Sequence, residues 1–194
     1  MTTAAVISQR VLPRSRVTSV LLVVGAAALT ALAAQWEIPL PFTPVPITGQ
    51  TFAVLLTGAA LGMTLGAAGQ LLYVAAGALG LPIYAGGAAG WEEAQTGGTS
   101  GYLIGFIVAA AVVGYMAERR QDRTFPTMFT AFVLGSFIIY FFGVIGLMLT
   151  FDMTANEAIV VGVVPFVVGD LIKAAWAGLL LPGAWRLIGE HPRP

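Results

Sequence analysis

Two charged residues of opposite sign, Asp170 and Lys173, are the side chains in this sequence best suited to bind a ligand. They are three residues apart, a spacing that puts both on one face of a helix, and Pro165 can start that helix. Their neighbours are apolar, and Lys173 is the only lysine in the chain. A carboxylate and an ammonium together suit a small ligand that has a carboxylate and N–H donors. The structural alternative is that the two charges neutralise each other and fix their helix against a neighbour.

The residue types that are missing exclude most catalytic chemistry. The only histidine, His191, is in the tail and cysteine is absent, so neither a hydrolase triad nor a transition-metal site can form. Glu92 and Glu93 are adjacent and do not converge as a paired acid and base would. A Walker A loop needs serine or threonine after its lysine, but Lys173 is followed by alanine. We expect no enzyme, metal or cofactor, and energy for uphill transport must come from a partner or an ion gradient.

The elements that position Asp170 and Lys173 are predicted to be membrane helices. With 58% hydrophobic residues, 9% charged residues and a mean hydropathy of +0.89, a chain of 194 residues has too little polar surface for a water-soluble globule. Each crossing needs about 20 apolar residues, so the length allows about six crossings. We predict an all-α integral membrane protein, a compact bundle of six transmembrane helices at residues 17–34, 51–62, 65–84, 101–116, 125–150 and 165–187.

The arginines predict the orientation of this bundle, because basic residues are retained in cytoplasmic loops. The expected outer loops contain acidic residues and no basic ones, whereas the opposite side receives all eight arginines: Arg10, Arg14, Arg16, Arg119, Arg120, Arg123, Arg186 and Arg193. Both termini are then cytoplasmic, with residues 1–16 as an N-terminal segment, 17–187 as the membrane domain and 188–194 as a tail. The first run is alternatively a cleaved signal peptide, since Ala31-Leu32-Ala33 can be read as a cleavage site.

The depth of Lys173 and the outer loops together predict a pocket. Lys173 lies thirteen residues before Arg186, which is about 20 Å along a helix and roughly 10 Å below the outer membrane surface. A charge at that depth should face the bundle interior or a water-filled cavity. The first outer loop is stiffened by four prolines, and polar side chains near it and in the second loop are candidate contacts: Thr48, Gln50, Tyr84, Thr99 and Tyr102. Trp36, Trp91 and Tyr102 can equally be membrane-interface residues.

Small residues at four-residue spacing predict close helix packing. They recur in three sets, Gly58-Gly62-Gly66, Gly101-Gly105 and Ala27-Ala31. Such spacing lets helix backbones approach one another in membranes. For the two glycine sets we expect contacts within the bundle.

Four motifs in order along the chain resemble those of the BioY family, the biotin-binding S components of energy-coupling factor transporters. The likeness runs from the first expected helix to the last, and its motifs are residues 41–56 (PFTPVPITGQTFAVLL), 80–87 (GLPIYAGG), 101–106 (GYLIGF) and 169–174 (GDLIKA). Two departures are Gly49, where the family usually has leucine, and residues 98–102, which read GTSGY in place of a Gly-Pro-Thr-Gly-Gly-Tyr pattern.

The resemblance implies a six-helix protein of the bacterial inner membrane that captures biotin from outside at high affinity. It implies as partners a transmembrane coupling subunit and two cytoplasmic ATPase subunits that power release. Asp170 and Lys173 match the family's ligand-contacting pair in the final helix, with either residue free to meet either end of biotin. The segment Ala27 to Ala31 resembles the motif by which S components dock on the coupling subunit.

Three other functions stay open at the level of the residues. The first is a self-sufficient small-molecule transporter that acts without an ATPase module. The second is a membrane enzyme, disfavoured by the missing histidine and cysteine. The third is a purely structural subunit, which would bind no specific ligand.

Overall fold

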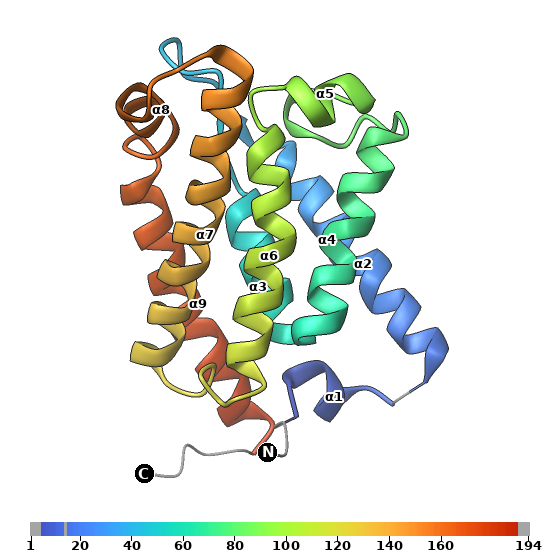
Figure 1. Cartoon of the computed structure of the whole chain (residues 1–194). Helices are drawn as coiled ribbons and strands as arrows, with labels where there is room; N and C mark the ends of the chain where they lie inside the picture. The colour runs from blue at the N-terminus through green and yellow to red at the C-terminus, as the bar shows by residue number, and fades with distance from the viewer. Residues whose placement is uncertain (1–4, 14, 190–194) are drawn as a thin grey trace.

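Six longer helices pack side by side in the computed structural model, which describes residues 5–13 and 15–189 (Figure 1). In chain order these helices are α2 (Arg16–Ala34), α3 (Gln50–Leu61), α4 (Met63–Ala78), α6 (Ser100–Ala117), α7 (Phe125–Phe151) and α9 (Val167–Leu187). Each apolar run expected from the sequence overlaps one of these helices. His191, Arg14, Arg193 and most of the expected tail lie outside the described residues.

Four of these helices, α2, α6, α7 and α9, are long and apolar enough to cross a membrane, while α3 and α4 are shorter apolar helices. Several shorter elements that we did not predict complete the described chain: α1 (Ile7–Val11), α5 (Trp91–Thr96), α8 (Ala155–Gly162), the 3-10 turn η1 (Ala85–Gly87), and strands β1 (Glu37–Ile38) and β2 (Ile47–Thr48). The fold is therefore mainly helical, as predicted, with one antiparallel pair of two-residue strands, β1 and β2.

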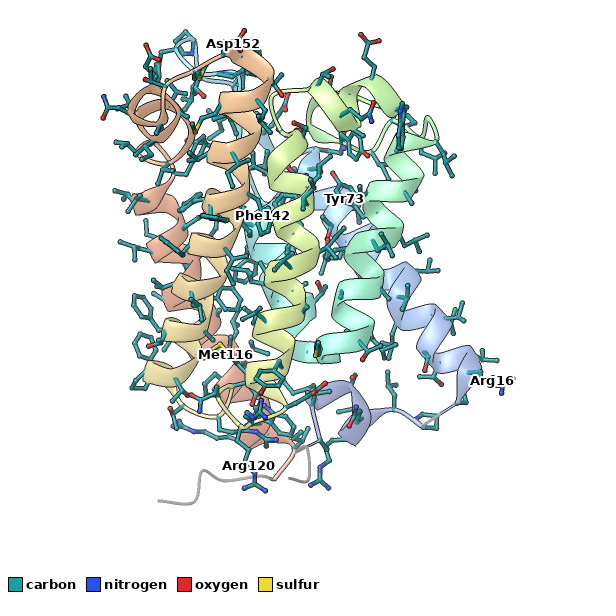
Figure 2. The ribbon with its side chains drawn as sticks, viewed as in Figure 1. Arg16, Tyr73, Met116, Arg120, Phe142 and Asp152 are labelled. Carbon is teal, nitrogen blue, oxygen red and sulfur yellow. The ribbon has the colours of Figure 1, made fainter. Side chains whose placement is uncertain are left out.

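The two ends of the bundle differ in the charged residues that lie there. Arg16 and Arg120 lie at one end, which we call the arginine end, and Asp152 lies at the other (Figure 2). The helix α1 lies under the arginine end, while α5 and α8 lie at the Asp152 end (Figure 1).

The break between α3 and α4 is at Gly62, whose φ of +85° favours glycine. The backbone N–H of Met63, the first residue of α4, donates to Glu118 Oε1 at 3.0 Å. A carboxylate at a helix N-terminus satisfies a free donor and interacts favourably with the helix dipole.

The predicted C-terminal part of the third helix was wrong, because α4 ends at Ala78 and not at Tyr84. Gly80 has a φ of +103°, and Pro82, two residues later, has no N–H to continue a helical ladder. The chain turns here towards η1 and α5.

The glycine sets pack as predicted within the bundle. A Cβ on Gly58 would lie 2.6 Å from the carbonyl oxygen of Ala110, and one on Gly66 would lie 2.8 Å from Gly58 Cα. A Cβ on Gly105 would lie 2.9 Å from Ile139 Cα on α7. These side-chain-free surfaces let α3, α4, α6 and α7 approach closely.

A buried polar network joins α2, α3 and α4. Thr30 Oγ1 donates to Gln70 Oε1 at 3.1 Å, and Gln70 Nε2 donates to Thr57 Oγ1 at 3.0 Å. All three side chains are buried. Hydrogen bonds between helices specify their relative register where water is absent.

Candidate ligand-binding site

Asp170 and Lys173 lie in the first two turns of α9 and form an ion pair, with Lys173 Nζ 2.7 Å from Asp170 Oδ1. The side chain of Asp170 is 5% exposed and that of Lys173 is 24% exposed. A pair held this far from water is stable only if its remaining hydrogen-bonding groups are satisfied. The contacts around it meet this condition.

The ammonium of Lys173 has two further acceptors from the preceding part of the chain. It donates to the carbonyl oxygen of Thr48 at 2.9 Å and to Thr51 Oγ1 at 2.8 Å. Thr48 ends β2 and Thr51 is in the first turn of α3. The lysine therefore connects α9 to both the hairpin and α3.

The carboxylate of Asp170 accepts hydrogen bonds from two other helices. Thr51 Oγ1 donates to Oδ1 at 3.0 Å, and the hydroxyl of Tyr140 on α7 donates to Oδ2 at 2.6 Å. With Lys173, the carboxylate accepts from three donors, which offsets the cost of burying it.

A cavity lies directly beside this pair. The cavity has a volume of about 40 Å³, room for only a few water molecules, so a larger ligand needs its walls to move apart. Five elements contribute walls: the proline-rich loop with β2, then α3, α6, α7 and α9. Its described lining is Val45, Pro46, Thr48, Gln50, Thr51, Thr99, Tyr102, Phe106, Tyr140, Phe166, Asp170 and Lys173.

The polar side chains of Thr48 and Gln50 on one wall are held by hydrogen bonds. Thr48 Oγ1 donates to Gln50 Oε1 at 2.9 Å, and Gln50 Nε2 donates to the hydroxyl of Tyr73 at 2.7 Å. Tyr73 lies in the interior of the bundle (Figure 2) and donates in turn to the carbonyl of Ile83 at 3.2 Å. This chain of bonds fixes the Gln50 amide at the rim of the cavity.

Thr99 and Tyr102 come from the start of α6 on the opposite side. The hydroxyl of Tyr102 donates to the carbonyl of Gly162 in α8 at 2.7 Å, so its ring, not its hydroxyl, is free to face a ligand. Thr99 is the N-cap residue of α6.

The proline-rich loop covers the cavity and is anchored at both ends. Its strands pair Glu37 with Thr48 and Ile38 with Ile47. Pro44 in this loop lies against Gly98, which precedes α6: a Cβ on Gly98 would be 2.7 Å from the Pro44 carbonyl oxygen. The loop therefore packs on the backbone before α6. Pro46 and Thr99 line both this cavity and a second, more polar one between the loops.

Tyr84 is the one predicted contact that does not line the cavity. Its hydroxyl donates to the carbonyl of Val74 at 2.6 Å, and its ring makes an edge contact with Tyr73. Burial raises the pKa of its phenol. It lines the second, more polar cavity, which is separated from the ion pair by Pro46 and Thr99.

The two alanines predicted to dock a partner are turned largely inward. Ala27 is buried in the core and Ala31 is half-buried against it. The exposed small residues of α2 are Gly25 and Ala28.

The groups that line this cavity are suited to holding a small molecule. Over residues 5–13 and 15–189, no cluster of three histidine, cysteine, aspartate or glutamate side chains could hold a metal ion. An aromatic and apolar enclosure with one cation, one anion and a fixed amide suits a small molecule that has both donors and acceptors.

Comparison with known proteins identifies the family. The sequence model of the BioY family matches residues 4–190. The chain belongs to the BioY family. This BioY chain is 39% identical over 172 residues to the biotin transporter BioY of Thermotoga maritima, covering 88% of this chain and 93% of that protein. It is 35% identical over 168 residues to the biotin transporter BioY of Rhizobium etli, covering 83% and 89%.

A solved structure has the same fold as this BioY chain. It is the S-component for biotin from an ECF-type ABC transporter, with a TM-score of 0.78, 21% sequence identity and coverage of 90% of this chain and 95% of that one. As a member of a family of membrane transporters, this BioY protein is not an enzyme.

Sequence reasoning did not select several residues that line the BioY cavity. Thr51 and Tyr140, the two hydroxyl donors to Asp170, were not chosen, and neither were Phe106 and Phe166. Tyr140 had a usable signal, because it is a hydroxyl-bearing residue in the middle of an apolar helix of 27 residues. The two phenylalanines had none, since phenylalanine is common throughout such helices.

Proposed function

We propose that this protein captures biotin with high affinity as the membrane-embedded S component of an ECF-type ABC transporter, for biotin uptake. The observation that carries this proposal is the Asp170–Lys173 pair beside a cavity, in a chain whose relatives are named biotin transporters. The site residues are Asp170, Lys173, Thr48, Gln50, Thr99 and Tyr102, joined by Thr51 and Tyr140.

Biotin has a carboxylate, a ureido group with two N–H donors and a carbonyl, and an apolar bicyclic body. Lys173 binds the carboxylate or the ureido oxygen, and Asp170 accepts a ureido N–H in a charge-assisted bond. The rings of Phe106 and Phe166 supply the apolar walls against which the bicycle packs. Since Lys173 already has three partners, the ligand must replace at least one of them.

In the membrane, residues 17–187 form six crossings with both termini in the cytoplasm of a bacterium, flanked by the segment 1–16 and the tail 188–194. Support comes from Arg16 and Arg120 at one end of the bundle, and from Asp152 and the acidic helix α5 at the other (Figures 1 and 2). The twelve residues of α3 reach only about 18 Å. This length is less than the hydrocarbon core of about 30 Å, so α3 spans only part of the membrane's thickness.

The partners in this proposal are a transmembrane coupling subunit and two cytoplasmic ATPase subunits. The chain has no Walker A loop of its own, since its only lysine is in the ligand site. For docking through the small residues of α2, Gly25 and Ala28 supply the contact surface, while Ala27 and Ala31 hold α2 close to the bundle.

The test is isothermal titration calorimetry on the purified chain with biotin, thiamine and riboflavin. We expect biotin to bind with a dissociation constant in the nanomolar range and the other two vitamins not to bind measurably. Equal binding of all three, or of none, would refute the assignment. Uptake of biotin by cells that express this chain without a coupling subunit or ATPase would instead support a self-sufficient transporter.

A further inference from the structure

A second, larger hollow opens on the outside of the bundle, between α2, α3 and α9. Its volume is about 770 Å³, far larger than the volume of about 40 Å³ of the ligand cavity. We call it the lateral groove. Its walls include Leu29, Leu32, Phe52, Leu56, Trp176 and Leu180.

The lateral groove is unfavourable both when filled with water and when left empty. Its lining is almost wholly apolar, so water would have few hydrogen-bond partners there. An empty groove would deprive its side chains of dispersion contacts on one side. Hydrocarbon satisfies the lining, and it is what surrounds this groove, because α2 and α9 are both helices able to cross a membrane.

The form of the groove distinguishes it from ordinary lipid-facing surface. Three helices give it two sides and a floor, so a chain lying in it makes more contacts than one on a convex helix face. At the end of α2, Trp36 and Gln35 line it, and the Trp36 side chain is 82% exposed. An exposed tryptophan beside an apolar span is typical of the membrane interface, where a lipid headgroup would lie.

One residue, Lys173, lines both the lateral groove and the ligand cavity. Its ammonium is occupied by Thr48, Thr51 and Asp170. The methylene stem is what remains to face the groove, as in other partly buried lysines. A chain in the groove would therefore lie against the back of the ligand-site lysine.

We propose that the lateral groove binds one acyl chain of a membrane lipid, which packs on the stem of Lys173 and separates the ligand-site ion pair from the surrounding bilayer. The lipid enters from the leaflet at the Asp152 end, where Trp36 lies beyond the end of α2. This binding does not depend on which ligand the cavity accepts.

The test uses the purified chain in phosphatidylcholine vesicles that contain a fraction of lipid with a diazirine at the end of one acyl chain. After illumination, labelled residues are located by mass spectrometry of peptides. We expect Leu29 and Leu180 to be labelled several-fold more than Leu72 on α4, which has an exposure of 37%, close to the 41% of Leu29.

Leu29→Trp fills the groove and should lower labelling of Leu180 several-fold, whereas the matched variant Leu72→Trp should leave it unchanged. Leu180→Trp, read by the labelling of Leu29, repeats the test from the other wall. Biotin calorimetry on each variant keeps this result separate from the proposed function. The proposal is overturned if labelling depends only on how exposed each residue is, or if neither Leu29→Trp nor Leu180→Trp lowers it. Either outcome is expected if a partner protein, and not a lipid, occupies the groove.

Discussion

Two buried carboxylates lie near opposite ends of α9, and they have different surroundings. Asp170 is in the first turn of α9. Asp122, in the loop between α6 and α7, accepts from the indole N–H of Trp185 at 2.6 Å, in the last turn of that helix. Each carboxylate pairs with a nearby cation, Lys173 for Asp170 and Arg123 for Asp122.

The difference between them is the space beside each pair. Asp122 is wholly buried, and the Arg123 guanidinium lies 3.1 Å from the centre of the Trp185 ring and donates to the carbonyl of Ala5. Burial raises the pKa of the Asp122 carboxyl, opposed by Trp185 and Arg123. Asp122 lines no cavity described above, whereas Asp170 does. A buried ion pair is therefore not by itself a sign of binding, and the adjoining cavity makes the difference.

The largest effect is expected from breaking the cluster of Asp122, Arg123 and Trp185. Asp122→Ala leaves Arg123 without its carboxylate, which should lower the free energy of unfolding by about 3 kcal/mol or more. Unfolding in detergent, followed by circular dichroism against denaturant, measures it. Biotin affinity of the folded fraction should stay within about threefold; a loss of affinity as large as that of a Lys173 variant would show that the two ends of α9 are coupled.

The next effect concerns the ligand site. Lys173→Ala removes the cation and leaves Asp170 buried without it, which should weaken biotin binding by about 100-fold, or about 3 kcal/mol. Calorimetry measures the change. Arg186→Ala, which removes an exposed cation from the same helix, is the matched control and should have no effect. Unchanged affinity in the Lys173 variant would remove the residue from the site.

A smaller effect is expected at Tyr140. Tyr140→Phe deletes the hydroxyl that donates to Asp170 Oδ2. A hydrogen bond to a charged group contributes about 1.5 kcal/mol, so biotin affinity should fall about tenfold. Tyr115→Phe on α6, an exposed tyrosine away from the cavity, should leave affinity unchanged. If both variants bind equally well, Tyr140 does not position the carboxylate.

The smallest effect is expected at Tyr84. Tyr84→Phe removes the hydrogen bond to Val74 and should lower stability by about 1 kcal/mol. Biotin affinity should change less than twofold, because the ring lies outside the cavity. A tenfold loss of biotin affinity would show that Tyr84 contacts the ligand after all.

Much of the fold could be predicted because apolar runs and charge alternate clearly along this chain. The helix boundaries are set by residues whose effect is local, such as Gly62 between α3 and α4. The hairpin and the helices α1, α5 and α8 could not be predicted in the same way. They are short and depend on tertiary contacts, as Gly98 against Pro44 illustrates.

The ligand site was predictable where a residue was chemically unusual for its surroundings. Asp170 and Lys173 stand out in any apolar helix, and the prediction that they share one face is confirmed. Tyr84 was selected by residue type and loop position, but type alone does not give the direction of a side chain. Thr51 was not selected, because its contacts with Asp170 and Lys173 join two helices that are more than a hundred residues apart in the sequence.

The register of the hairpin has a consequence for how the site can open. Thr48 is both the strand partner of Glu37 and, through its carbonyl, an acceptor for the Lys173 ammonium. If the loop moves outward and Thr48 moves with it, the Lys173 ammonium loses the Thr48 carbonyl as an acceptor. Losing that hydrogen bond costs free energy, because Lys173 lies in an apolar helix. A ligand oxygen can take up that bond in place of the carbonyl. The Thr48 carbonyl and a ligand oxygen therefore compete for the Lys173 ammonium. Without a ligand this competition favours the closed loop, and a bound anion lowers the free-energy cost of opening it.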